Sequence, residues 1–315
     1  MSPVHSAAES VGQVEPLTVG RLLTGWTFDP VIAALLVAVG ASYLYGVWVL
    51  RRRGDAWPWP RTLSFVVLGL GSAAVATQSA LAAYDTVLLS THMVQHMLLS
   101  MVVPVFLALG APVTLALRTL TRTPRRWLLT VLHSRVAKVL SFPVVAFALY
   151  VLSPWALYLS GWYPATLHSP YLHEMMHLHF VLVGCLFFWP LLGIDPVPGR
   201  VAYPFRMLTA FGTLPFHAFL GVTVMSMSTL IAADWYRSLH LTWGPTPAQD
   251  QQIAGGLLWG SGDLVGLVIF GVLFVQWVRQ SQREAVREDR RLDRLEARAR
   301  AAEVERSVPT DSIGP

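Results

Sequence analysis

The sequence predicts an all-α membrane protein, a polytopic bundle of seven transmembrane helices. Of its 315 residues, 54% are hydrophobic and only 13% are charged. The mean hydropathy is +0.51, which indicates a membrane protein. Seven apolar runs reach or approach the ~20 residues that cross a bilayer. The sequence contains no series of ~10-residue alternating strands, so helices are the backbone that can satisfy its own hydrogen bonds in lipid.

The predicted spans follow one another with short connections. They lie near residues 31–50, 62–83, 88–110, 139–160, 172–193, 207–231 and 255–278. Segment 1–29 has no long apolar run after a basic start, so it does not resemble a cleavable signal peptide. We expect three parts: an extracytoplasmic segment 1–29, a membrane domain 30–279 and a charged cytoplasmic tail 280–315. Glu and Arg recur at helical spacings in the tail, so we expect it to continue the last helix.

Basic residues predict the orientation of the bundle. The first, third and fifth loops and the tail carry most of the Arg and Lys residues, beginning with Arg51, Arg52 and Arg53. In the loops between them, Asp85 lies in the second and Arg237 in the sixth. Cytoplasmic loops are rich in Lys and Arg. The N-terminus is therefore expected outside and the C-terminus in the cytoplasm.

The histidines are unevenly distributed over this topology, with only one of the ten in a cytoplasmic loop. His92 and His96 are four residues apart, so they share one face of the third span. His173 and His177 have the same spacing on the fifth span. At ~1.5 Å per residue, the two pairs lie at similar depth below the outer surface. Titratable residues inside a span are costly and are functional by default. We predict that these four histidines form a metal site.

Neighbouring residues extend the predicted site. His217, near the middle of the sixth span, is a fifth candidate ligand, although a lone intramembrane histidine often only hydrogen-bonds another helix. Glu174 could balance the charge of a metal or accept a proton, and His179 could be an accessory residue. Met225 and Met227 lie at the outer end of the sixth span, two residues apart and so on different faces. Imidazole and thioether form a soft ligand set, which favours Cu(I) over zinc.

Two other classes of protein remain open. The segment 172-LHEMMHLHF-180 contains the H-E-x-x-H pattern of zinc metalloproteases, in which Glu174 would activate a water molecule. Histidines from two helices could also hold a b-type haem, although there are more of them than one haem needs. A single cysteine, Cys185, excludes a thiolate-rich metal site within the chain. The sequence contains no basic patch with interleaved aromatic residues, so nucleic acid is not an expected partner.

Four motifs, in this order, resemble the caa3-CtaG family of cytochrome c oxidase assembly factors: 91-THMVQHMLL-99, 173-HEMMHLHFVLVGCLFFWPLLGIDP-196, 214-LPFHAFLGV-222 and 250-DQQIAGGLLWGSGD-263. The resemblance covers roughly residues 25 to 280. It implies a bacterial plasma-membrane protein, not itself an enzyme, that handles copper for haem–copper oxidase. Its partners would be oxidase subunits and an extracytoplasmic copper carrier. Within the last motif, we expect Asp250 to cap the final helix.

Overall fold

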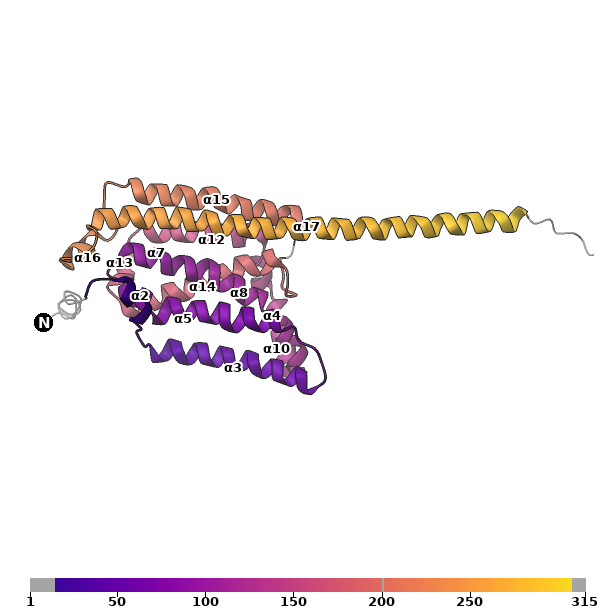
Figure 1. Ribbon diagram of the computed structural model, residues 1–315, viewed down its shortest axis with the longest axis horizontal. Coiled ribbons are helices and arrows are strands. Elements are labelled where there is room, and N and C mark those ends of the chain that lie inside the picture. The colour runs from indigo at the N-terminus through magenta and orange to yellow at the C-terminus, as the bar shows by residue number, and fades with distance from the viewer. Residues whose placement is uncertain (1–14, 200, 308–315) are drawn as a thin grey trace, which may run out of the picture.

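The computed structural model describes residues 15–199 and 201–307, and those ranges are mainly helical (Figure 1). Segment 1–29 is therefore described only from residue 15 and the tail only to residue 307, and the rest of both lies outside the described residues. Six helical segments are long and apolar enough to cross a membrane: Pro30–Arg52, Trp59–Tyr84, Leu89–Leu109, Pro170–Leu192, Tyr203–Ser226 and Pro247–Arg300. A seventh apolar helix, Pro143–Tyr158, has only 16 residues. The protein is thus an all-α, multi-pass membrane protein, while the count of seven spans stays a prediction.

The spans divide into labelled helices. The long ones are α3 (Pro30–Arg52), α12 (Pro143–Tyr158), α14 (Pro170–Leu192), α15 (Tyr203–Ser226) and α17 (Pro247–Ser307). The second span joins α4 (Trp59–Thr62), η1 (Leu63–Leu70), α5 (Gly71–Gln78) and α6 (Ala80–Tyr84). The third joins α7 (Leu89–Met97), η2 (Leu98–Val102) and α8 (Val103–Leu109), where η marks a π-helical stretch. Short helices connect them: α2 (Val19–Thr24), α9 (Pro112–Thr119), α10 (Arg122–Leu132), α11 (Arg135–Leu140), α13 (Trp162–Leu167) and α16 (Ala233–Ser238).

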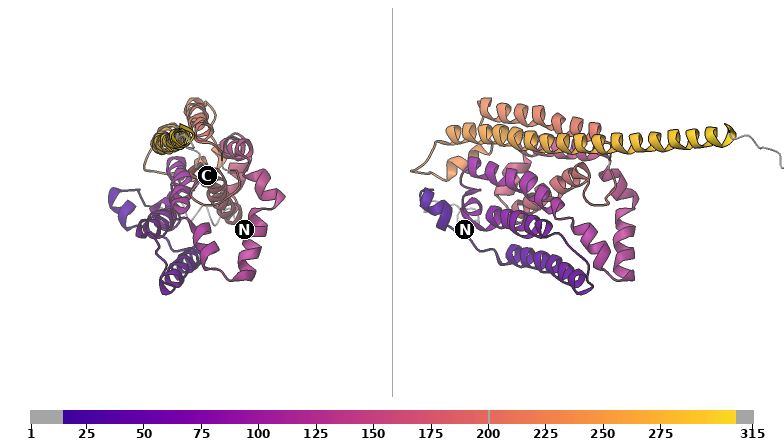
Figure 2. Two further views of the ribbon diagram at one scale, coloured as in Figure 1. Left: turned by 90° about the vertical axis from the view of Figure 1, so that its right-hand side faces the viewer. Right: turned by 45° about the vertical axis from the view of Figure 1, so that its right-hand side comes forward.

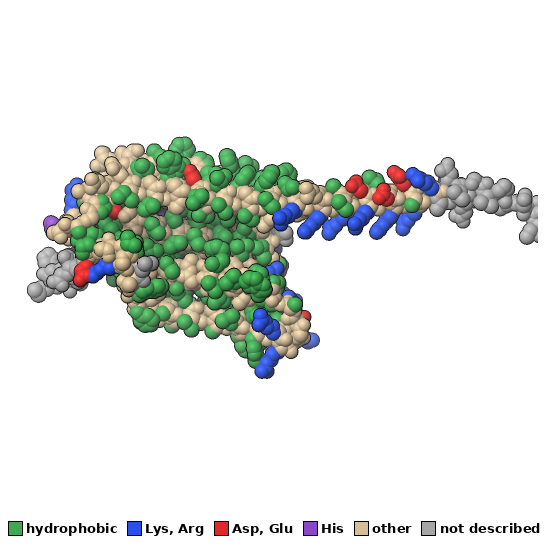
Figure 3. Space-filling model, in the orientation of Figure 1, with side chains coloured by type: hydrophobic (Ala, Val, Ile, Leu, Met, Phe, Trp, Pro, Cys, Tyr) green, Lys and Arg blue, Asp and Glu red, His purple; other side chains and the backbone are tan. Residues whose placement is uncertain are grey.

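The third span forms the centre of the bundle. In its most apolar window 67% of the residues are buried, against 17% in α3, which lies on one flank (Figures 1 and 2). Helix α14 packs against η2 and α8, and also against α12 and α13. Helices α15 and α17 pack along each other on the opposite flank. The two histidine-bearing helices, α7 and α14, therefore lie inside the protein, while apolar side chains cover much of its outer face as lipid contact requires (Figure 3).

Several helix boundaries differ from the predicted spans, and the last helix begins at Pro247 rather than near 255. The fourth span does not begin at residue 139, because the chain leaves helix α11 after Leu140 and starts α12 at Pro143. Proline suits that first helical position because its missing N–H would be unpaired there in any case. Helix α15 begins at Tyr203 rather than near 207, and it ends at Ser226 because Met227 adopts an extended backbone.

Asp250 does not cap its own helix, contrary to our expectation, since α17 already begins at Pro247. Its carboxylate instead accepts hydrogen bonds from the backbone N–H of Leu89 at 2.6 Å and of Ser90 at 3.3 Å. The Ser90 hydroxyl donates to the same carboxylate. The first N–H groups of a helix have no partner within that helix. Asp250 therefore caps α7 and ties the last span to the helix that carries His92.

Helix α17 continues without a break from the last span into the charged tail, 61 residues in all. Its second half projects beyond the bundle (Figure 1). Figure 3 shows Lys and Arg side chains along this projecting part and at the adjacent corner of the bundle, where α3 ends. This distribution agrees with a cytoplasmic tail, and the orientation itself stays a prediction.

Candidate metal centre

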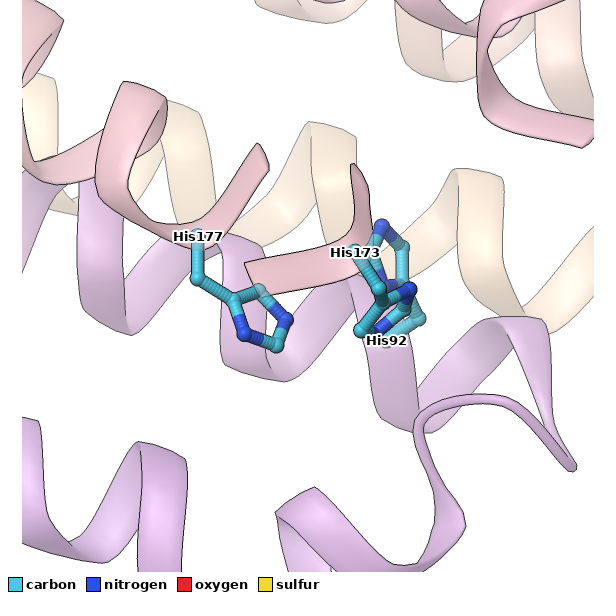
Figure 4. A group of neighbouring side chains, drawn as sticks. All are labelled: His92, His173 and His177. Atoms are coloured by element: carbon cyan, nitrogen blue, oxygen red, sulfur yellow. The ribbon is translucent and has the colours of Figure 1, made fainter. Parts of the chain in front are cut away.

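Three of the predicted ligands meet at the centre of the bundle. His92 comes from α7, and His173 and His177 come from α14 (Figure 4). One ring nitrogen from each lies within 4.8 Å of those of the other two. All three side chains are buried. The i, i+4 spacing places both α14 imidazoles on the face that packs toward the third span, as the sequence predicted.

Each histidine of this triad (His92, His173 and His177) keeps one buried ring nitrogen without a hydrogen-bond partner among the described residues. These atoms are Nδ1 of His92, Nδ1 of His173 and Nε2 of His177. Leaving one buried polar atom unpaired costs about 1–3 kcal/mol. One such atom on each of three neighbouring histidines is unfavourable unless a ligand satisfies them. Of the three atoms, Nε2 of His177 also lies 3.5 Å from the Asp85 carboxylate. Neutral imidazole nitrogens are common metal ligands, so the triad fits a metal ion.

Asp85, from the loop between α6 and α7, folds into the same site. Its Oδ2 atom lies 2.9 Å from Nε2 of His173 and 3.5 Å from Nε2 of His177. Only 4% of the residue is exposed. Burial alone would raise the pKa of the Asp85 carboxyl, but its contacts with the two histidines outweigh burial and hold the pKa below its ordinary value. The carboxylate is therefore charged and fixes the ring of His173 as a carboxylate does in metal sites.

Sequence reasoning missed the role of Asp85. It was assigned only to the second loop, because a residue in an irregular segment has no periodicity to place it. One signal was present: Asp85 is an acidic residue in an outer loop that leads directly into the helix of His92.

His96 lies apart from the triad, one helical turn further along the third span. Its Nδ1 is 2.8 Å from the hydroxyl of Tyr158, which also lies 3.0 Å from Nε2 of His92. The ring of His96 stacks on Phe180 with 4.0 Å between centroids. His217 belongs to α15 and donates from Nδ1 to a backbone carbonyl of its own helix. The metal-binding roles of His96 and His217 stay predictions.

The four accessory residues also lie outside the triad. The Glu174 side chain is 48% exposed, and its carboxylate is 3.4 Å from Nδ1 of His177. His179 is exposed on the other side of α14. Met225 packs over Gly255 of α17, so close that a Cβ there would lie 2.5 Å from its Cγ. Met227 is partly buried against the hydrophobic core. Their predicted contribution to metal binding is not tested by these positions.

Two tyrosines from connecting helices lie next to the triad. Tyr163 of α13 is fully buried, and its ring centroid lies 4.8 Å from that of His92. Its hydroxyl is 2.6 Å from that of Tyr236 in α16. Burial raises the pKa of both phenols, so both stay neutral. Beyond Tyr236 lies a groove of about 490 Å³, which His240 and Asp250 also line.

The protein is therefore a multi-pass helical membrane protein whose bundle encloses three buried histidines that could hold a metal ion. The chain belongs to the family described as cytochrome c oxidase caa3 assembly factor, whose model matches residues 41–280. This confirms the resemblance seen in the four motifs.

Relatives of this chain occur in mycobacteria. It is 41% identical to uncharacterized proteins of Mycobacterium bovis and Mycobacterium tuberculosis over 286 residues, and 38% identical to one of Mycobacterium leprae. These alignments cover 89% of this chain but only 43% of each relative, so the chain spans less than half the length of these relatives. No solved structure matches it. The family and the spans together indicate a multi-pass membrane protein of bacteria.

Proposed function

We propose that the protein binds copper at the triad and passes it to a subunit of haem–copper cytochrome c oxidase during assembly. The observation that carries this proposal is the convergence of three buried imidazoles, each with one ring nitrogen within 4.8 Å of those of the other two. Each of these rings also keeps one buried nitrogen without a hydrogen-bond partner among the described residues. Membership of the caa3 assembly-factor family supplies the oxidase as the partner. An extracytoplasmic carrier would deliver the copper, and the groove beside Tyr236 is the nearest large concave surface for either partner.

Charge supports Cu(I) as the cargo. Once their ring nitrogens are deprotonated to bind a metal, the three imidazoles are neutral, and with the Asp85 carboxylate they carry one negative charge. A monovalent ion would make the site neutral, whereas a divalent ion would leave one uncompensated positive charge in a buried region, which is costly. Glu174 could supply a second negative charge, but its side chain is half exposed rather than enclosed in the site.

The ligand set also supports transfer. Imidazoles from two helices bind copper without the closed thiolate cage that holds a metal permanently. Imidazole ligands from two separate helices can be exchanged one at a time, so the ion can leave by ligand exchange. Asp85 keeps the ring of His173 in place during that exchange through its contact at 2.9 Å.

The two alternatives are less well supported. A b-type haem would take two axial histidines from two helices, whereas three histidines converge here, more than one haem needs. A zinc hydrolase would use Glu174 to activate water, while in the structure this carboxylate contacts His177 from a half-exposed position. We therefore keep the prediction that the protein is not an enzyme.

Metal content tests the proposal. The detergent-purified protein is loaded with Cu(I) or with Zn(II) and analysed by elemental mass spectrometry. We expect bound copper in the wild type and at least one equivalent less in a His92→Ala, His177→Ala double variant. His179→Ala, an exposed histidine on the same helix, is the matched control and should bind as the wild type does. Zinc without copper in the wild type, or copper unchanged in the double variant, would overturn the proposal.

Two further measurements separate the alternatives. A Glu174→Gln variant should keep its copper, whereas a hydrolase with this base would lose its turnover. A visible spectrum of the purified protein should show no Soret band, and a strong band would establish the haem alternative.

A further inference from the structure

A second, much smaller cavity lies deeper in the bundle than the triad. It has a volume of about 10 Å³ and is lined by His96, Ser100, Tyr150, Pro154 and His217, among others. A cavity of this size holds one water-sized species at most. Organic ligands and clusters are excluded, so its content is a bare ion or a single water molecule.

The polar side chains around this cavity are buried and incompletely paired. His96, Ser100, Tyr150 and His217 are each at most 5% exposed. The hydroxyls of Ser100 and Tyr150 have no hydrogen-bond partner among the described residues. Buried polar groups are nearly always paired, and in a membrane span they are expensive. A water molecule or an ion in the inner cavity would satisfy these groups.

The helical backbone is irregular at the same place. Ser100 lies in η2, a π-helical stretch of the third span, and such stretches are frequent at functional sites. Pro154 lies inside α12 and has no N–H to donate to the carbonyl of Tyr150, four residues earlier. Within a membrane, freed backbone groups are tolerated where they are buried in protein or line a polar cavity. The third span and α12 thus both depart from regular α-helical hydrogen bonding beside this one small cavity.

The surrounding charges favour a cation over water. The Nδ1–H of His217 donates to the carbonyl of Thr213, so its Nε2 carries a free lone pair. His96 and His217 are close enough to interact electrostatically. Asp263 of α17 also interacts with His217, and its Oδ1 is buried without a hydrogen-bond partner. Two imidazoles offer ligands for Cu(I), and the nearby Asp263 carboxylate, with one buried oxygen that lacks a hydrogen-bond partner, offers the charge that a monovalent cation needs.

We propose that the inner cavity is a second copper site, which holds one Cu(I) between His96 and His217. The inference rests on the proposed function, because it takes copper as the cargo. Tyr158 separates the two sites, since its hydroxyl contacts both His92 of the triad and His96 of the inner cavity. Copper that reaches the triad moves one helical turn inward by exchanging His92 for His96.

Copper stoichiometry of the full-length protein tests this site. The purified protein is titrated with Cu(I) against a chromophoric chelator, and the bound metal is counted by elemental mass spectrometry. His217→Gln removes the ring but keeps an N–H that can reach the Thr213 carbonyl. His173→Ala removes one ligand of the triad. We expect two equivalents in the wild type and one in each variant. His133→Gln, at an exposed histidine that follows α10, is the matched control and should keep two.

The outcomes separate the two proposals. Two equivalents in a folded His217→Gln protein, or only one in the wild type, would overturn the inner site and leave the triad standing. No copper in the wild type would overturn both proposals. If His217→Gln does not elute as a monodisperse protein, His96→Gln replaces it. This variant removes the other proposed ligand and should likewise bind one equivalent of copper.

Discussion

Replacing Asp85 by Asn is the sharpest test of how the triad works. The change removes one negative charge but keeps an oxygen that can accept the Nε2–H of His173, now 2.9 Å away. The orientation of the ring should therefore survive while charge compensation is lost. Partners of this kind change metal affinity by about 10- to 100-fold, which corresponds to about 1.4–2.7 kcal/mol. Two opposite unit charges about 4 Å apart attract each other by about 4 kcal/mol at an effective dielectric constant of about 20. This energy exceeds the expected loss of binding free energy, so removal of the Asp85 charge can account for that loss.

The assay is Cu(I) affinity, measured by competition with a chromophoric chelator in detergent. We expect Asp85→Asn to bind Cu(I) 10- to 100-fold more weakly than the wild type, and Asp85→Ala to be weaker still because the ring of His173 is also released. Asp234→Asn is the matched control, since this exposed carboxylate lies in α16 at the same end of the protein. An Asp85→Asn protein with wild-type affinity would refute the charge argument.

Three further substitutions test the packing around the metal centre. Tyr158→Phe removes the hydroxyl that contacts both α7 histidines, His92 and His96, and should lower the free energy of unfolding by about 1–3 kcal/mol. The measurement is the thermal unfolding midpoint, and an unchanged midpoint would contradict these two hydrogen bonds. Gly184→Ala places a Cβ against the backbone carbonyl of Ser100 in η2, so α14 must shift, at a cost of about 1–3 kcal/mol. The amount of copper bound per protein should therefore fall. Gly260→Ala is the control, because a Cβ there meets no atom within 4 Å. Asp250→Asn should weaken the cap of α7 by about 1 kcal/mol, and hydrogen exchange at the start of α7 that equals the wild type would speak against that role.

The all-α class could be predicted because long apolar segments in lipid must pair their own backbone N–H and C=O groups, and helices do this within one segment. The fourth span shows where this reasoning stops. Val136 and Val139 make α11 apolar enough to merge with α12 in a hydropathy window, although the chain breaks at Ser141 and Phe142. The break depends on a local backbone conformation that an average over neighbouring residues does not detect.

The metal centre was predictable in part for a related reason. Spacing alone places His173 and His177 on one face, because a helix fixes the angle between residues four apart. It could not decide which histidine of α7 they meet, since His92 and His96 share a face and differ only in depth, by about 6 Å. Asp85 was beyond such reasoning, because its contact with His173 joins segments 88 residues apart. Long-range contacts from loops have no period to reveal them.

The length of α17 has a mechanical consequence. An unbroken helix of 61 residues is about 90 Å long, and it behaves as a stiff rod over much of that distance. Near one end, Asp250 fastens this rod to the first turn of α7, a single turn before His92. The other end stands clear of the bundle (Figure 1). A protein that binds the exposed end of α17 and tilts this helix would also displace Asp250. Because Asp250 is bonded to the first turn of α7, such a tilt would move the imidazole of His92.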